Sequence, residues 1–278
     1  MFHDNVDKNK YLYHFTSHTT ALEHILPSGN LRLSPYIYMN DPRERQNWRF
    51  GFSGSLDNDE FFKMQDELNS ILKSNTKLIC FTKDMVGSED YFMEHDGRGY
   101  SHPRMWAQYG GNHTGVCLMF DKTILEKVID DEFSQRGLIH HGFVNYGARS
   151  LNSHYAFNSI NSEEIQSLGL KLFSKQHLNK YYKELFFEKM LDWKDESEYR
   201  WVFFSNEDRH YEVFKFQDAL VGIILGVDFP PVYETIIESY CKKSNIHVIR
   251  MDWYNGKPNI LPVYTPGMDQ SDFRKVLF

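Results

Sequence analysis

The apolar residues of this chain occur in many short runs, and this pattern limits the folds that the chain can adopt. Two runs of six residues, KLICFT at 77–82 and GVCLMF at 115–120, predict buried β-strands. Other segments, such as 58–73 and 122–129, carry apolar residues at helical spacing. Short strands mixed with amphipathic helices are typical of an α+β fold. We expect a single domain over residues 1–278, because no repeat or low-complexity linker divides the sequence.

The same two patterns continue along the rest of the chain. An opening strand, helix and strand span residues 11–33, and Pro27 and Gly29 end the helix. Residues 161–193 predict two helices that are divided near 169–174. Two strands are expected at 198–205 and 211–216. A last unit of strand, helix and strand is expected at 220–226, 230–243 and 247–252, and residues 226–278 form a C-terminal αβ extension of the domain.

Composition and charge narrow the classes of protein to consider. The chain has 22 Phe, 17 Tyr and 5 Trp, which favours a core and pockets built from aromatic rings. Its formal net charge is −7, so nucleic-acid binding would need a local basic patch. No window approaches the roughly 18 apolar residues of a transmembrane helix, and the first ten residues are polar. We therefore expect a cytoplasmic protein without a membrane partner.

Cysteine and histidine spacing indicates no metal site. Cys80, Cys117 and Cys241 are odd in number and widely spaced, unlike a disulfide framework or a cysteine zinc site. The 13 histidines include no pair of clusters with ligand spacing. The motifs GxGxxG, GxxxxGK[ST], GxSxG and HExxH are absent as well, so the usual signatures of Rossmann, P-loop, α/β-hydrolase and zincin enzymes are missing.

Residues 83–104 interrupt the regular pattern. They mix Gly, Pro, His and acidic residues without any period. A loop of this length in a globular domain is usually functional or mobile. We expect a lid or a specificity loop here.

Four motifs bring chemically active side chains together. His14 lies in the aromatic segment YHFTS, and residues 40–45 place two carboxylates and two guanidiniums beside a turn. Residues 105–115, MWAQYGGNHTG, lead through glycines into a strand. In WKDESEYRW, strand alternation would direct Glu196 and Glu198 to the same face. Each motif also has an ordinary interpretation: a core histidine, a solvated helix start, aromatic packing, or a strand start with salt bridges.

Five segments taken in order resemble a widespread bacterial family of uncharacterised proteins, catalogued as a domain of unknown function. They are YHFTS, PSGNLRLS, NDPRE, MWAQYGGNHTGVCLMFD and WKDESEYRW, and the resemblance covers roughly residues 11–225. The opening unit, with His followed by Thr–Ser, a helix and a Gly–x–Leu–x–x–Ser strand, is also similar to ADP-ribosyltransferases, particularly the DNA-modifying toxins. This likeness implies a mixed, largely antiparallel split sheet flanked by helices, and an enzyme that consumes NAD.

The likeness to ADP-ribosyltransferases implies roles for individual residues. His14 corresponds to the residue of the first strand that holds the ribose or adenosine portion of NAD. Tyr109 takes the middle position beside the nicotinamide. Glu198 is the late acid that stabilises oxocarbenium charge on the ribose, and Glu196 is the second choice. Further candidate NAD contacts are Thr16, Ser34, Asn40, Arg43, Arg45, Trp106, His113 and Glu196, of which the two arginines would meet the pyrophosphate or an anionic acceptor.

The resemblance implies an ADP-ribosyltransferase or NAD glycohydrolase of toxin or phage-defence type. NAD is then the substrate, the acceptor is nucleic acid or protein, and an antitoxin or defence-system protein is an expected partner. A nucleic-acid acceptor would need a basic stripe, for which the candidates are Arg43, Arg45, Arg49, Arg98 and Arg104.

Two other classes of function stay open. The aromatic residues also suit a non-catalytic module that binds a nucleotide or a partner, and released nicotinamide would separate this module from the enzyme. A metal-dependent nuclease, identified by its sensitivity to chelators, would use Asp41, Glu44, His95, Glu196 and Glu198. The central prediction is that His14, Tyr109 and Glu198 converge on one pocket, although 95 and 89 positions separate them in the sequence.

Overall fold

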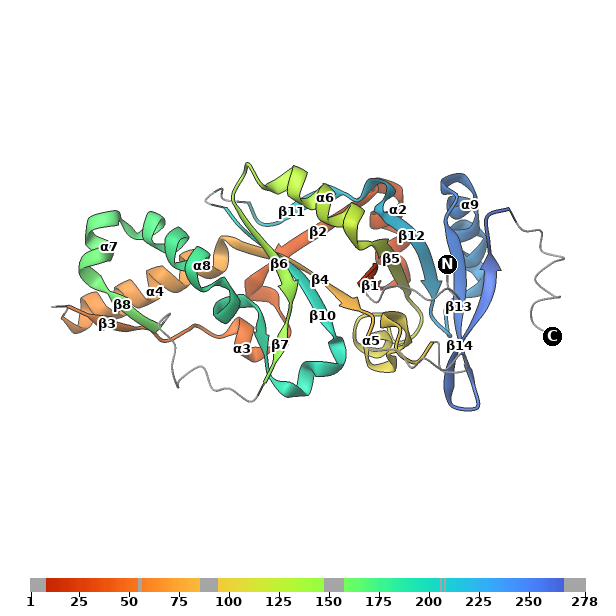
Figure 1. Cartoon of the computed structure of the whole chain (residues 1–278), viewed down its shortest axis with the longest axis horizontal. Helices are drawn as coiled ribbons and strands as arrows, with labels where there is room; N and C mark the ends of the chain where they lie inside the picture. Colours follow the sequence, from red (N-terminus) through yellow and green to blue (C-terminus); the bar gives the residue numbers. More distant parts are fainter. Residues whose placement is uncertain are drawn as a thin grey trace.

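One ten-stranded sheet forms the framework of the molecule (Figure 1). The structure is a computed structural model that describes residues 9–54, 57–85, 95–147, 158–205, 207 and 209–267. The strand order is β11-β2-β4-β1-β5-β12-β13-β14, and β10 pairs with both β4 and β6. Among the described strands of this sheet, all pairs are antiparallel except β12 and β13. The strands are β1 (Tyr11–Thr16), β2 (Asn30–Pro35), β4 (Thr76–Lys83), β5 (Val116–Asp121), β6 (Leu138–Phe143), β10 (Glu198–Phe204), β11 (Glu212–Lys215), β12 (Leu220–Leu225), β13 (His247–Tyr254) and β14 (Lys257–Tyr264).

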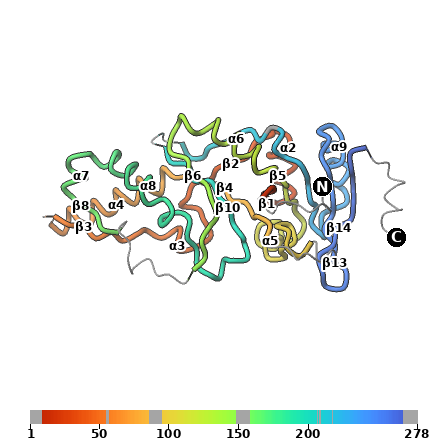
Figure 2. The backbone as a smooth tube through the Cα atoms, viewed as in Figure 1, coloured from red at the N-terminus to blue at the C-terminus, as the bar shows by residue number. Residues whose placement is uncertain are grey.

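Helices cover the sheet and extend the molecule at one end. Figure 2 shows an elongated shape in which α4, α7 and α8 lie at the end opposite to α9. Two small parallel sheets complete the fold, β3 (Gly51–Ser53) with β8 (Ser159–Asn161) and β7 (Asn145–Tyr146) with β9 (Glu188–Lys189). The helices are α1 (His18–Thr20), α2 (Leu26–Ser28), α3 (Pro42–Arg45), α4 (Asn58–Ser74), α5 (Pro103–Gln108), α6 (Lys122–Phe133), α7 (Ser162–Leu168), α8 (Leu170–Phe186) and α9 (Glu234–Ser244); shorter π and 3-10 turns include η1 (Ala21–Ile25), η4 (Gly99–Ser101) and η6 (Leu191–Glu196).

Side-chain alternation along β4 and β10 divides these strands between two cores. Ile79 packs into the core that also contains residues of α6 and α9, whereas Leu78 packs into the core shared with α4 and α8. Glu198 and Arg200 alternate with core residues along β10, and they lie on the α4 and α8 side because Val202 of the same parity does. The sheet therefore carries two charged residues into a mainly apolar layer.

The sheet splits along one edge of β4. On its other edge β4 pairs with β10 over the whole strand. On the split edge, Tyr13 of β1 pairs with Thr82 and Ser34 of β2 pairs with Leu78. The two strands diverge between these pairs, so that Cys80 has no strand beside it on this edge. This split places a cavity in the middle of the sheet.

The fold class expected from the sequence is confirmed at the level of an α+β protein with a largely antiparallel sheet flanked by helices. The strands at 11–15, 31–33, 77–82 and 115–120 are present as β1, β2, β4 and β5. The helices at 58–73 and 122–129 are present as α4 and α6, each begun by an aspartate side chain that accepts from the first turn.

One expectation about the second half of the chain needs correction. The helical segment expected up to residue 193 ends at Phe186, and the chain then forms β9 and η6. Its division near Gly169 is confirmed. The strand, helix and strand expected in the C-terminal unit are present as β12, α9 and β13, and they extend the main sheet because β12 pairs with β5 and β13 pairs with β12. A further strand that the sequence analysis missed, β14, follows.

The segment expected as a lid, residues 83–104, lies only partly within the described residues. Residues 86–94 lie outside them. In the described part, Gly99, Tyr100 and Ser101 form a buried turn, and Gly99 packs so closely on Tyr13 that a Cβ would clash. The turn at Gly99–Ser101 is thus packed against β1.

None of the helices in the described ranges is long and apolar enough to cross a membrane.

Candidate functional site

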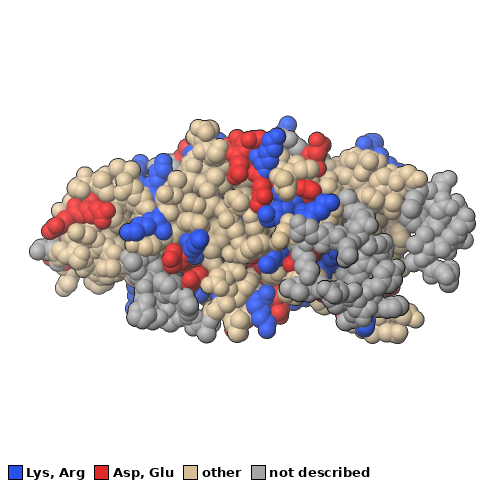
Figure 3. Space-filling model, in the orientation of Figure 1, with Lys and Arg blue, Asp and Glu red and all other residues tan. Residues whose placement is uncertain are grey.

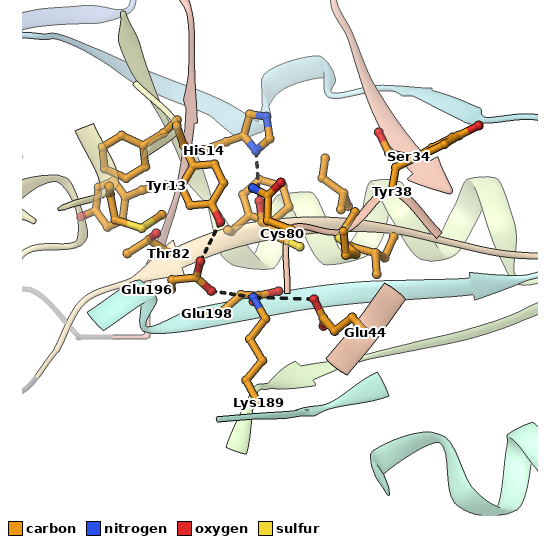
Figure 4. A pocket seen from close by; sticks show the side chains of 18 of the residues that line it. Tyr13, His14, Ser34, Tyr38, Glu44, Cys80, Thr82, Lys189, Glu196 and Glu198 are labelled. Atoms are coloured by element: carbon orange, nitrogen blue, oxygen red, sulfur yellow. Dashed lines mark hydrogen bonds and ion pairs between the residues drawn. The ribbon is translucent and has the colours of Figure 1, made fainter. Parts of the chain in front are cut away.

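A cavity of about 280 Å³ opens at the split between β1 and β2 (Figure 4). It lies just below the range of about 300–1,000 Å³ for pockets that enclose drug-sized ligands, so it suits one nucleoside-sized part of a dinucleotide. The three residues predicted to converge, His14, Tyr109 and Glu198, all line it. Its other lining residues are Tyr13, Phe15, Arg32, Ser34, Tyr38, Met39, Asn40, Glu44, Leu78, Ile79, Cys80, Phe81, Thr82, Met105, Lys189 and Glu196.

His14 lies on β1 and uses one ring nitrogen to close part of the split. Its Nδ1 is 3.0 Å from the carbonyl oxygen of Cys80. A carbonyl only accepts, so Nδ1 carries the proton and Nε2 of the neutral ring is an acceptor. Burial lowers the pKa of His14 below its ordinary value, which favours this neutral form. His14 is thus suited to position a ligand by hydrogen bonding.

The strand backbone also reaches the cavity. Lys83 donates its N–H to the carbonyl of Ser197 at 3.0 Å, so odd-numbered residues of β4 bond to β10. Cys80 therefore directs its N–H and C=O to the split edge. Just before β1, the carbonyl of Lys10 accepts from Lys122 at the start of α6, on the β5 side of the strand, so even-numbered residues of β1 bond to β5. The odd-numbered Phe15 therefore directs its N–H and C=O to the split edge. Such an edge can pair with a planar amide of a ligand.

Glu198 is held by a neighbour on its own strand. Arg200, two residues further along β10, donates from Nε to Oε1 at 2.5 Å and from Nη2 to Oε2 at 2.7 Å. Burial alone would raise the pKa of Glu198, but Arg200 and Lys189 outweigh it and hold the pKa far below the ordinary value. Glu198 is an ionised carboxylate with both oxygens engaged.

Lys189 of β9 is the centre of the charged cluster. Its Nζ lies 2.6 Å from Glu196 Oε2, 2.8 Å from Glu198 Oε2 and 3.9 Å from Glu44 Oε2. Burial would lower the pKa of Lys189, but the three carboxylates outweigh it and raise the pKa well above the ordinary value. The ammonium therefore stays charged at the floor of the cavity.

Tyr109 and Glu196 form a hydrogen-bonded pair at one wall. Tyr109 is the residue that follows α5, and its hydroxyl donates to Glu196 Oε1 at 2.7 Å. Burial and the nearby Glu196 carboxylate raise the pKa of Tyr109 well above the ordinary value, so the phenol stays protonated. The expected strand alternation of Glu196 and Glu198 is wrong: Glu196 ends η6, and Ser197 turns the chain through a left-handed conformation with φ 44°.

Glu44 reaches the cavity from the opposite side, on α3. The Asp41 side chain caps this short helix by accepting from Arg43 N–H at 2.9 Å. Glu44 Oε1 accepts from Arg200 Nη1 at 2.5 Å, whereas Oε2 has no hydrogen-bond partner among the described residues. Thr82 Oγ1 is a second buried lining atom for which the described residues supply no hydrogen bond.

The predicted NAD contacts divide into two groups. Ser34, Asn40 and Glu196 line the cavity. Thr16 and Trp106 are outside its lining: Thr16 pairs with β5 at the end of β1, and Trp106 is a core residue.

His113, Arg43 and Arg45 also lie outside the lining of the cavity. The backbone carbonyl of His113 accepts from Asp228 N–H at 3.1 Å, and His113 has a left-handed φ of 69° in the turn before β5. Arg43 faces away on α3 and forms an ion pair with Glu188 at 3.0 Å, and Arg45 is exposed. None of these three residues lines the cavity as the structure describes it.

Lys189 and Thr82 are among the lining residues that sequence analysis missed. For Lys189 the reason is its local sequence. The segment that carries it was expected to continue the preceding helix, because its apolar residues keep helical spacing. Two-residue strands such as β9 leave almost no periodic signal. In contrast, Glu198 and Arg200 are two residues apart in an expected strand, so the sequence predicts that they share a face and can form an ion pair.

The acidic residues surround cations rather than a metal position. Lys189 and Arg200 contact the oxygens of Glu196 and Glu198 that a metal ion would need. Within the described ranges, no group of three His, Cys, Asp or Glu side chains is placed to hold a metal. His95 is hydrogen-bonded to the Tyr100 hydroxyl at 2.8 Å and lies outside the cavity lining. The geometry gives the nuclease alternative no support.

The comparison with protein families matches the central part of the chain. Residues 105–201 match the model of a family described as "Protein of unknown function (DUF2971)". The expected resemblance to a domain of unknown function is thereby confirmed over these residues, which run from α5 to β10 and include Tyr109, Lys189 and Glu198. No curated protein and no solved structure matches the chain.

Proposed function

We propose that this protein is an ADP-ribosyltransferase-like enzyme that cleaves NAD between nicotinamide and ribose. The observation that carries the proposal is the arrangement of His14, Tyr109 and Glu198 around one cavity at the split of an antiparallel sheet. The resemblance in sequence assigned these three residues to one NAD site, and they come from three distant segments. Their arrangement around one cavity supports the proposal without testing the reaction itself.

The chemistry of the lining residues suits this reaction. Breaking the bond between ribose C1′ and the nicotinamide nitrogen leaves the electron pair on nicotinamide and positive charge on the ribose. The acceptor, or water, then forms the new bond to C1′ and loses a proton. The ionised carboxylate of Glu198 stabilises the developing cation, and His14 and the Tyr109 ring position the two ends of the nicotinamide riboside.

A protein acceptor or water fits the surface better than nucleic acid does. The expected arginine stripe is interrupted, because Arg98 is buried and paired with Asp84 at 3.4 Å. Arg104 donates to a backbone carbonyl at Asp192. Figure 3 shows acidic and basic side chains interspersed on one face rather than gathered into a basic patch. The proposed action as a toxin or phage-defence effector, with an antitoxin or defence-system partner, rests on the sequence resemblance alone.

The proposal is tested by measuring free nicotinamide after the pure protein is incubated with NAD, with and without a panel of acceptors. We expect the wild type to release nicotinamide and Glu198→Gln to lose about 10²–10³-fold in rate, as when a preorganised electrostatic group is removed. Glu132→Gln on α6, whose carboxylate is 45% exposed, is the matched control and should keep the wild-type rate. Thermal melts verify that each variant is folded.

A non-catalytic binding module is the second candidate, and one observation favours it. Both oxygens of Glu198 are engaged by Arg200 and Lys189, which leaves the carboxylate strongly neutralised. A protein that binds NAD in calorimetry and releases no nicotinamide with any acceptor would be such a module. Full activity of Glu198→Gln would instead remove Glu198 from the mechanism.

A further inference from the structure

Three residues that line the cavity have a buried side-chain oxygen without a hydrogen-bond partner in the described part of the protein: Tyr13, Glu44 and Thr82. Tyr13 interacts with the carboxylate of Asp84. This leaves Glu44 Oε2 and Thr82 Oγ1, in side chains that are 2% and 1% exposed. Buried polar atoms are nearly always hydrogen-bonded, so an unpartnered one at a cavity wall points to a group that the ligand supplies. Figure 4 shows Thr82 and Glu44 reaching the cavity from different elements, β4 and α3.

Of the three carboxylates around Lys189, Glu44 alone has an oxygen free of hydrogen bonds in the described structure. Glu196 accepts from Tyr109 and Lys189, and both oxygens of Glu198 accept from Arg200. Glu44 Oε2 lies 3.9 Å from Lys189 Nζ, which is beyond hydrogen-bond distance. The cluster holds three acids and two bases, so Glu44 is the acid that is least neutralised.

The surroundings of this oxygen decide what chemical group it can take. A carboxylate oxygen accepts hydrogen bonds, so its partner must be a donor. Lys189 stands beside it and repels a second cation. A neutral donor, such as a hydroxyl group, therefore fits this oxygen. Burial raises the pKa of Glu44, and Arg200 and Lys189 offset only part of this effect.

We propose that Glu44 is the substrate-facing carboxylate of this site, which accepts a hydrogen bond from a hydroxyl of the nicotinamide ribose, with Thr82 as a second contact. This inference rests on the proposed NAD-cleaving function. It assigns that ribose to Glu44 because Glu44 and Glu198 share Lys189. Glu198, which stays paired with Arg200 and Lys189, then stabilises the developing positive charge, and Glu44 binds the sugar hydroxyl.

Two variants test the contacts by calorimetric titration of NAD into the full chain. Glu44→Gln removes the charge, and we expect its Kd for NAD to rise about tenfold or more, since hydrogen bonds to charged groups are the stronger ones. Thr82→Val removes one hydroxyl at nearly constant shape. We expect it to weaken binding about fivefold while leaving the melting temperature equal or higher, because the hydroxyl makes no hydrogen bond to any described residue.

The matched control is Asp41→Asn. Asp41 is also buried, has an unpartnered oxygen and lies next to α3, but it does not line the cavity. Asparagine caps helices as well as aspartate does. We expect the Asp41→Asn protein to bind NAD with wild-type affinity.

A 2′-deoxy analogue of the nicotinamide ribose completes a double-mutant cycle. The wild type should bind this analogue more weakly than NAD, and this difference should be smaller in Glu44→Gln, whose neutral amide forms a weaker hydrogen bond. Equal wild-type affinity for NAD in Glu44→Gln and Thr82→Val would overturn the inference and leave the proposed function standing. Failure of the wild type to bind NAD would overturn both. If Glu44→Gln does not fold, Thr82→Val tests the inference. Weaker NAD binding with an equal or higher melting temperature would support it, and unchanged binding would overturn it.

Discussion

At the scale of single residues, Arg200 holds the charged cluster together. Its side chain is fully buried and donates to Glu198, Glu44 and the carbonyl of Phe186 at the end of α8. Removing it would leave two buried carboxylates short of partners, and breaking a buried ion pair costs about 3–5 kcal/mol. We expect Arg200→Met to lower the free energy of unfolding by about this amount in urea titrations.

The control for this prediction is an arginine in a surface ion pair. Arg209 is 55% exposed and contacts Glu207 at 2.9 Å. It also lies 3.6 Å from the buried Glu212, which keeps a closer partner in Arg136 at 2.5 Å. Substitutions at such positions usually change stability by about 0.5 kcal/mol or less. Equal losses in Arg200→Met and Arg209→Met would show that the buried cluster contributes no more than a surface pair.

His14 makes stability depend on pH in the acidic range. Its pKa is lowered by burial, whereas an unfolded histidine titrates near 6.5. When the pH falls below about 6.5, the unfolded chain binds a proton that the folded chain resists, so stability falls. We expect His14→Gln to lose less stability than the wild type between pH 7 and pH 5, measured by denaturant titration at each pH.

His24 provides the comparison, because it is exposed on η1. His24→Gln should keep the pH dependence of the wild type. A wild-type slope in His14→Gln would mean that His14 is free to protonate in the folded protein. Its Nε2 would then be a donor, which contradicts its assignment as an acceptor in the site.

At the scale of elements, the turn between η6 and β10 directs two acids into the cavity. Ser197 has a φ of 44°, a left-handed conformation that costs most residues about 1–2 kcal/mol and is especially unfavourable for β-branched ones. Ser197→Gly should keep both fold and nicotinamide release. Ser197→Val should lower the melting temperature and the rate, because the turn must shift and displace Glu196 and Glu198. Wild-type behaviour of Ser197→Val would show that the turn geometry does not set the site.

Elements with a strong local pattern could be predicted from the sequence, and those defined by pairing could not. Strands β4 and β5 are apolar runs of the right length, and α4 has a capping box of Asp57 and Glu60 before helical spacing. Strand β9 has two residues and exists only through its pairing with β7. Because strand register follows from tertiary contacts, no local pattern marks the split at Cys80.

The same division applies to the site. His14 and Glu198 lie in segments with recognisable motifs, so they were expected there, although their roles in catalysis stay predictions. Glu44 lies in NDPRER, which looks like an ordinary solvated helix start. It is buried in the structure and accepts from Arg200, which lies 156 residues later in the chain. Contacts of this range carry no signal in the local sequence.

At the scale of the whole molecule, the cavity depends on a continuous sheet. Strand β1, which carries His14, is held by β5 on one side, and β5 is held in turn by β12. The C-terminal unit therefore supports the site from a distance, although none of its residues lines the cavity in the described structure. The family match ends at residue 201, so this support lies outside the matched segment.

A chain that ends at Asp228 should fail to fold for this reason. It would keep β12 but lose Ile237, Cys241 and Val248, which are fully buried in the same core as Ile223. Each large apolar side chain contributes about 1.5–3 kcal/mol when buried, so their loss consumes much of a typical stability of about 5–15 kcal/mol. We expect the truncated chain to show no cooperative unfolding, whereas Val232→Ser, at a side chain 72% exposed, should unfold like the wild type. Cooperative unfolding of the truncated chain would instead make the C-terminal unit a separable addition to the sheet.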